Sequence, residues 1–248
     1  MRPILIFAII ITTSVFANAQ STRALAHFNK GVEASKKGDN KAALEHFTAT
    51  YTSIEREGAT DRFFATVHYD LGVTLYELRR PKDAVEHLEK ALRFSNRMHP
   101  RAQYVMGLVR FDLGDLDAAE TAFRRSIALS QDDAEAWYEL AFVHLAANDN
   151  ENAKRAFAKA AKLGAAGAAS SRNNLGVLLA REGKFAAAAI EFEKASTLDR
   201  SGIALANLDK CKRLMENSSI AEAAAELRFV PRRGSTSYEQ TARHTRDN

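Results

Sequence analysis

Histidine and cysteine are the residues of this chain whose side chains could bind a metal ion or act as a nucleophile. The chain contains seven histidines and one cysteine, Cys211. Zinc sites need three or four such ligands at close spacing, and the sequence has no H-E-x-x-H motif and no paired cysteines. His27 and His68 lie at equivalent places of an internal repeat, as do His46 and His87, which favours a shared packing role. We therefore predict no metal site and no cofactor.

Motifs for enzymatic chemistry are equally absent from the sequence. It has no G-x-S-x-G nucleophile motif and no glycine loop that could hold a phosphate, and Cys211 falls in an expected capping helix without an identifiable base to activate its thiol. The run Asn148-Asp149-Asn150-Glu151 has the composition of a calcium loop but neither its length nor its terminal glutamate, so a turn and helix N-cap is the better interpretation. The sequence predicts a protein without enzymatic activity.

A small residue recurs along the chain at a nearly constant interval. The spacings are 41, 35, 34 and 35 residues, from Gly31 to Gly72, Gly107, Ala141 and Gly176. A second small residue follows each of these at a fixed offset, and a bulky one comes four positions later: Ala43 and Phe47, Ala84 and Leu88, Ala119 and Phe123, Ala153 and Phe157, Ala188 and Phe192. A period of this length is typical of a solenoid built by stacking one supersecondary unit.

The composition indicates that each repeated unit is helical. The chain is 46% apolar, has only 4 Pro and 12 Gly, and shows no alternating strand pattern. Each unit reads as two antiparallel helices; in the fourth we expect helices over Ala134–Ala147 and Glu151–Leu163. The small residues let the two helices approach closely, and the bulky residue fills the gap between them.

These residues resemble the tetratricopeptide repeat. Leu71-Gly72, Met106-Gly107, Leu140-Ala141 and Leu175-Gly176 carry the first half of its pattern, and Trp137 supplies its leading aromatic once. The resemblance covers about Ala24 to Asp199 and implies an all-α fold, a right-handed superhelical α-solenoid of about five helix-turn-helix units with a C-terminal capping helix. Two departures are Arg79, which replaces the turn glycine of the second unit, and the missing closing proline.

The N-terminus has the pattern of a signal peptide. Arg2 gives a positive start, Ile4–Phe16 is mostly apolar, and Ala17-Asn18-Ala19 supplies a small-x-small cleavage site before Gln20. The apolar stretch is shorter than the roughly 20 residues that span a bilayer, and no cysteine follows the cleavage site to carry a lipid. We predict an exported protein, periplasmic or secreted, with no stable membrane insertion after cleavage.

The predicted organisation follows from these patterns. About seven extra residues within 50–64 predict lengthened helices or an insert in the first unit, and Ile203–Glu216 is expected to cover the last exposed face. Ser219–Phe229 could add a short final helix. The predicted parts are a signal peptide (1–19), five repeat units (20–59, 60–98, 99–133, 134–167 and 168–201), capping helices (202–229) and a disordered basic tail (230–248).

The first helix of each unit lines the concave face, where the resemblance implies that partner peptides bind. Projecting this face onto the sequence places aromatic residues in the middle of the groove and polar residues at one end. Buried packing is the alternative for each single ring. The predicted groove residues are Tyr69, Tyr76, Tyr104, Phe111, Tyr138, Phe142, Asn173 and Arg181.

The function that follows is that of a non-enzymatic scaffold or adaptor of the cell envelope, which binds a partner protein or peptide in the aromatic groove. A formal net charge of +4 over 248 residues predicts no nucleic-acid binding. One alternative is a structural, self-associating protein and thus a homo-oligomer, in which the tail from Pro231 reaches back into the groove. Another is an accessory subunit that activates an envelope enzyme.

Overall fold

The computed structural model of the 248-residue chain describes residues 22–164, 167–199, 202–216 and 227–232. The predicted signal peptide lies outside the described residues, as do most of the predicted helix over 219–229 and the tail from residue 233. The chain divides into two compact units: unit 1 ends at Val109, and unit 2 begins at Arg110.

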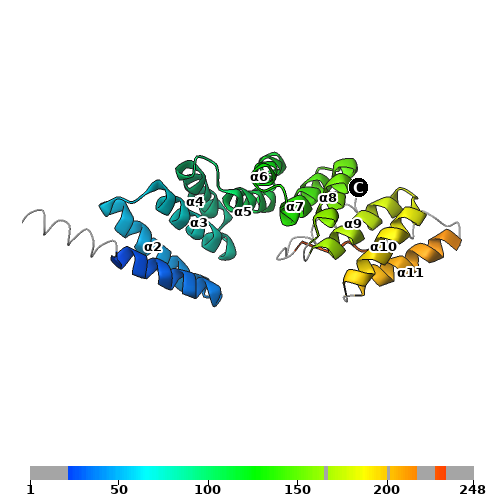
Figure 1. Ribbon diagram of the computed structural model, residues 1–248, viewed down its shortest axis with the longest axis horizontal. Helices are drawn as coiled ribbons and strands as arrows, with labels where there is room; N and C mark the ends of the chain where they lie inside the picture. The colour runs from blue at the N-terminus through cyan, green and yellow to red at the C-terminus, as the bar shows by residue number, and fades with distance from the viewer. Residues whose placement is uncertain (1–21, 165–166, 200–201, 217–226, 233–248) are drawn as a thin grey trace, which may run out of the picture. The chain divides into compact units, whose positions relative to one another are not determined.

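All regular structure in the described ranges is helical (Figure 1). Unit 1 contains a helix over residues 22–36, α2 (Asn40–Glu57), α3 (Asp61–Glu77), α4 (Pro81–Phe94) and most of α5 (Pro100–Asp112). Unit 2 contains the end of α5, α6 (Leu116–Leu129), α7 (Ala134–Ala146), α8 (Asn150–Leu163), α9 (Ala168–Arg181), α10 (Phe185–Leu198) and α11 (Ile203–Glu216). The predicted all-α solenoid of helix-turn-helix repeats is confirmed.

Helices pack in sequence order within each unit. α3 packs on α4 in unit 1, while α7 packs on α8 and α9 on α10 in unit 2. Each pair also contacts its neighbour, α8 against α9 and α10 against α11. The two helices predicted for the fourth repeat differ from α7 and α8 by one residue at one end each.

The small and bulky residues of the repeat interlock inside each helix pair. A Cβ atom added at Gly31 would lie 2.7 Å from the Phe47 ring, and one added at Gly176 would lie 2.8 Å from the Phe192 ring. Both rings are buried. The glycines are therefore required by close helix approach, as the repeat pattern predicted.

The turns between paired helices need a backbone with positive φ. Glycine supplies it at Gly38, Gly114 and Gly183, with φ of 75°, 80° and 75°. Arg79 and Asn148 adopt the same conformation at φ 60°, which a residue with a Cβ atom enters at a cost of about 1 kcal/mol. In the second repeat Arg79 thus replaces the turn glycine, and the backbone of the turn keeps its positive φ.

The junction of the first and second repeats accommodates the extra residues by longer helices. α2 has 18 residues and α3 has 17, whereas the helices from α4 to α11 have 13 or 14. Of the two expectations for this junction, lengthened helices are the one observed.

The capping helix forms where the sequence predicted it, since α11 spans Ile203–Glu216. The chain then continues, in its last described stretch, as the non-helical segment Leu227–Arg232. Two expectations are corrected here: residues 227–229 are not helical, and residues 230–232 are packed against unit 2 instead of opening the disordered tail. Within the described ranges, every helix is too short or too polar to cross a bilayer.

Candidate peptide-binding face

The segment Leu227–Arg232, hereafter the C-terminal segment, contacts α5, α7, α9 and α11 of unit 2. Leu227 is 4% exposed and belongs to an apolar cluster with Leu208 and Leu214 of α11. Phe229 packs against that cluster and against the one formed by α7 and α8. Apolar side chains therefore anchor the first half of the segment, at about 1.5–3 kcal/mol for each fully buried one.

Two asparagines bind the backbone of the segment at alternate residues. Asn207 of α11 accepts a hydrogen bond from the Arg228 N–H at 3.0 Å and donates one to the Arg228 carbonyl at 2.8 Å. Asn174 of α9 does the same for Val230, at 2.7 and 3.0 Å. Residues two apart face the same way in extended chain, so this alternation identifies an extended backbone bound as a strand partner would bind it.

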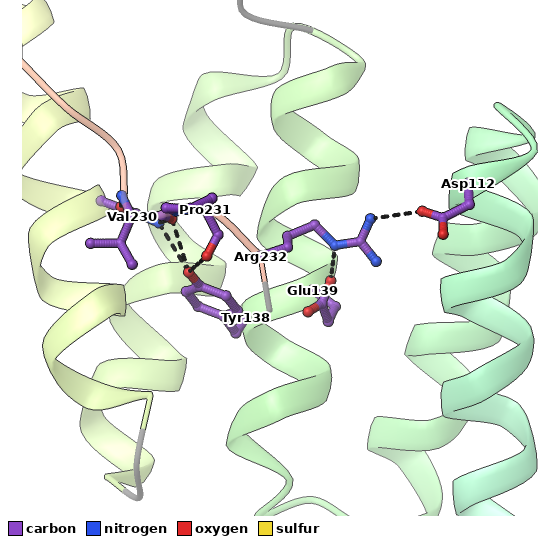
Figure 2. Close-up of polar contacts among 7 residues, drawn as sticks. Asp112, Tyr138, Glu139, Val230, Pro231 and Arg232 are labelled. Atoms are coloured by element: carbon purple, nitrogen blue, oxygen red, sulfur yellow. Dashed lines mark hydrogen bonds and ion pairs between the residues drawn. The ribbon is translucent and has the colours of Figure 1, made fainter. Parts of the chain in front are cut away.

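Further polar groups complete this backbone recognition. Asn173 donates to the Arg228 carbonyl at 2.9 Å and accepts from Asn207 at 2.8 Å. The Tyr138 hydroxyl lies 3.1 Å from the Val230 carbonyl oxygen and 3.4 Å from that of Pro231, so its proton is donated to either one (Figure 2). Asn173, Asn174 and Asn207 are at most 2% exposed, and buried amides of this kind are costly unless they are hydrogen-bonded.

The Arg232 side chain lies between two acidic residues from two helices (Figure 2). Its Nε donates to Glu139 of α7, and its Nη1 lies 3.2 Å from the Asp112 carboxylate at the end of α5. The guanidinium also covers the Phe111 ring, with Cζ 4.2 Å from the ring centre. Burial raises the pKa of Glu139, and the guanidinium offsets part of that rise.

We call the set of side chains that contact the C-terminal segment through hydrogen bonds, ion pairs or cation–π geometry the binding face. It combines acceptors and donors for a backbone, an acidic pair for a cation, and aromatic rings. Its members are Phe111, Asp112, Tyr138, Glu139, Asn173, Asn174, Arg181 and Asn207.

Four of the predicted groove residues belong to this face. Phe111, Tyr138 and Asn173 contact the segment as described, and the Arg181 guanidinium lies 4.7 Å from the centre of the Phe229 ring. Phe142, by contrast, is 3% exposed and packs edge-on against the Tyr138 and Phe157 rings. Phe142 is therefore a buried packing residue, which was the alternative to a groove position.

The other three predicted groove residues are in unit 1. Tyr69 stacks on His99 with ring centres 4.8 Å apart, and the Arg101 guanidinium lies 5.2 Å from the centre of the Tyr104 ring. Tyr76 is half-buried near the end of α3. Their role in binding stays a prediction.

Sequence reasoning missed Asp112 at the end of α5, and it missed Glu139, Asn174 and Asn207, which occupy equivalent places in α7, α9 and α11. The projection took the residue three places before each small residue, whereas these side chains come from the next position along the helix. A signal was present: Glu139 and Asn174 directly precede the pattern leucines Leu140 and Leu175, and Asn207 directly precedes Leu208 of the capping helix α11. Asp70 occupies the same place before Leu71 in unit 1, and burial raises the pKa of its carboxyl to about 6.

The two histidine pairs of the repeats and the cysteine are placed for packing. His68 and His87 face each other with Nδ1 atoms 3.0 Å apart, and His27 and His46 form the equivalent pair at 3.5 Å. Over the described ranges, no three His, Cys, Asp or Glu side chains gather as metal ligands would. Cys211 is buried, its Sγ donates to the Phe185 carbonyl, and burial raises the pKa of its thiol. Asp149 caps α8 by accepting from the Asn152 N–H, as predicted.

Comparison with protein families decides the assignment. A tetratricopeptide-repeat model matches residues 69–134, 104–153 and 138–202, which together span more than half of the chain. The chain belongs to the tetratricopeptide-repeat family. A search of curated proteins finds no match for this repeat protein.

Solved structures share the fold of this tetratricopeptide-repeat chain. PilF of Pseudomonas aeruginosa aligns with a TM-score of 0.65 at 17% identity, over 92% of this chain and 99% of that one. MamA, residues 41 to the end, from Desulfovibrio magneticus RS-1 aligns with 0.61 at 23%, over 72% and 96%. YrrB, described as a TPR protein with an unusual peptide-binding site, aligns with 0.60 at 21%, over 80% and 97%. At these identities the likeness concerns the fold alone.

Proposed function

We propose that the protein is a non-enzymatic scaffold that binds an extended segment of a partner protein on the binding face of unit 2. One observation carries this proposal: the face already holds an extended segment, the chain's own, through paired hydrogen bonds from Asn174 and Asn207 to its backbone. Backbone recognition of this kind supplies affinity for any extended chain, and side-chain contacts add specificity. YrrB, which shares the fold and is described as having a peptide-binding site, supports the same use of the fold.

The C-terminal segment competes with such a partner. A tethered segment has an effective concentration on the order of millimolar, so a segment whose own intrinsic dissociation constant is about micromolar weakens the apparent affinity of a competing partner about a thousandfold. Partner binding therefore requires release of the segment.

The test is capture of partners by the full chain and by variants of the binding face. Asn174→Leu and Asn207→Leu remove the backbone contacts at similar side-chain volume, and Asn29→Leu alters an exposed asparagine of unit 1 as a matched control. The proposal requires a protein that the wild type and the control retain and that both face variants lose. Equal retention by all four chains would contradict it.

The cell envelope is the location we propose for this function. The support is sequence alone: the positive start, apolar stretch and small-x-small site of residues 1–19. Fusion of residues 1–30 to alkaline phosphatase tests export, because that enzyme needs disulfides that form outside the cytoplasm. An inactive fusion that accumulates in the cytoplasm would refute the location and leave the binding function standing.

Self-association is a second candidate function, favoured by the same docked segment. Two copies that exchange their C-terminal segments would each fill the other's binding face. Light scattering across a range of protein concentrations distinguishes the two: exchange requires a dimer that Asn174→Leu dissociates, whereas a segment docked within its own chain leaves a monomer.

A further inference from the structure

Equivalent residues of α11, α9 and α7 contact the C-terminal segment at every second residue. Asn207, which precedes Leu208 in the capping helix α11, contacts position 228, and Asn174, which precedes the pattern leucine Leu175 in α9, contacts position 230. In α7 the equivalent residue is Glu139, and it contacts position 232. The segment therefore runs opposite to the order of the repeats. Position 232 is contacted by a carboxylate, whereas positions 228 and 230 are contacted by amides.

At position 232 the contact is to a side chain instead of the backbone. Asparagine offers a donor and an acceptor, which match any peptide unit and carry no information about sequence. Glu139 is a carboxylate, which only accepts when ionised, and it is 6% exposed. A buried carboxylate selects a cationic partner, because leaving it unpaired is costly.

Two features of the pocket fit arginine better than lysine. The two carboxylates approach the guanidinium at different nitrogens, Glu139 at Nε and Asp112 at Nη1. The central carbon of the guanidinium also lies over the Phe111 ring, 4.2 Å from its centre. A lysine ammonium is a point charge that cannot present separate nitrogens to two carboxylates while covering an aromatic ring.

Pro231 lies between the residue whose backbone is bound by Asn174 and the arginine whose side chain is bound by Glu139. It follows Val230, whose N–H and carbonyl are both bound by Asn174, and it precedes the arginine. Proline has no N–H to leave unpaired and holds φ near −65°, which extended chain tolerates.

We propose that the binding face selects partner segments that carry arginine at the position of Arg232, two residues after the residue held by Asn174. The ligand class is an extended protein segment of the pattern apolar-x-apolar-apolar-Pro-Arg, and the chain's own Leu-Arg-Phe-Val-Pro-Arg is its resident competitor. This inference rests on the proposed function, since it specifies which segments that face accepts.

The test uses the full chain carrying Val230→Pro, which removes the N–H that donates to Asn174 and so weakens the resident segment. The probe is a fluorescent, end-blocked peptide of residues 227–232, titrated by polarisation. Two further peptides replace the final arginine by lysine or glutamine. We expect the glutamine peptide to bind at least about 30-fold and the lysine peptide about tenfold more weakly than the arginine peptide.

A second set of proteins assigns the selectivity to the pocket. Glu139→Gln in the same background removes the buried carboxylate at constant shape, and Asp112→Asn does so from the other helix. Glu135→Gln removes an exposed carboxylate one turn earlier on α7 and is the matched control. Selectivity for arginine over glutamine should fall to about threefold in either pocket variant and stay unchanged in the control. Helical circular dichroism and the urea midpoint establish that each variant is folded.

The outcomes separate the two proposals. Selectivity that depends on Glu139 or Asp112 supports the arginine pocket. Equal binding of the three peptides to the Val230→Pro chain overturns the pocket and leaves peptide binding intact. Absence of binding by every peptide to this folded chain overturns both proposals.

Discussion

Replacing Asn174 by leucine should release the C-terminal segment while unit 2 stays folded. The change removes two hydrogen bonds to Val230, of 2.7 and 3.0 Å, and a 3.2 Å bond from Asn173 to the Asn174 side-chain oxygen. Only the two bonds to Val230 join Asn174 to the segment, so at about 0.5–1.5 kcal/mol net for each bond the segment loses about 1–3 kcal/mol of docking free energy. Because about 1.4 kcal/mol is a tenfold change in an equilibrium, its open state becomes about 5 to 150 times more populated.

Hydrogen exchange followed by mass spectrometry measures this opening directly. The amide of Val230 is protected by its bond to Asn174, and it exchanges when the segment detaches. We expect faster exchange in a proteolytic peptide covering 227–232, by the factor given above, with amides of α7 and α8 unchanged. Asn29→Leu, on an exposed position of unit 1, is the control.

One result would refute the reasoning. If Asn174→Leu keeps the cooperativity and midpoint of urea unfolding and the exchange of Val230 stays slow, the asparagine does not hold the segment. The apolar anchors Leu227 and Phe229 would then carry docking by themselves, and the backbone-reading role of Asn174 and Asn207 would be wrong.

Three further predictions concern the scaffold. Burial is the main cause that lowers the pKa of His68 to about 4. Between about pH 6.5 and pH 4 the unfolded chain therefore binds a proton at His68 that the folded chain does not bind. The contribution of His68 to stability is full above about pH 6.5 and falls by about 3 kcal/mol toward pH 4. Gly176→Ala should destabilise unit 2 by about 1–2 kcal/mol in urea unfolding, because its Cβ would lie 2.8 Å from the buried Phe192 ring. Arg79→Gly should stabilise unit 1 by up to about 1 kcal/mol, measured in the same way, because Arg79 holds φ at 60°.

Each of these has a control. For His68 the measured quantity is the stability difference between wild type and His68→Gln at each pH; the subtraction removes the opposite effect of Asp70, whose raised pKa costs stability as pH rises. A difference that does not vary between pH 4 and 6.5 contradicts the first prediction. Phe192→Leu should rescue Gly176→Ala if the clash is its cause. A destabilised Arg79→Gly chain would show that contacts of the arginine outweigh the strain of its backbone.

The sequence by itself determined the helices and their pairing. The contact between Gly176 and Phe192 lies within one repeat, and the same small and bulky residues recur in phase along the chain, so local periodicity carries the information. The capping helix over Ile203–Glu216 follows from the same rule, because the last repeat leaves an apolar face to cover.

The groove residues predicted from the sequence lie one position before the residues that make the paired or ionic contacts, as Asn173 does before Asn174. Successive residues of an α-helix differ by about 100° in direction, so a choice of Asn173 over Asn174 selects a different part of the surface. Both are buried and both contact the segment, but Asn174 makes the paired bonds to a single peptide residue. Which direction faces a ligand depends on how neighbouring helices pack, and that is a tertiary property.

The place of the C-terminal segment was decided by tertiary structure alone. Its contacts join residues far apart in the chain: Arg232 pairs with Glu139 and Asp112, 93 and 120 positions away. Leu227–Arg232 is short and has no helical period, so its sequence gives no sign of what it packs against. Three helices from different repeats must first stack before Asn207, Asn174 and Glu139 form one row, and only then does an extended chain find partners at every second residue.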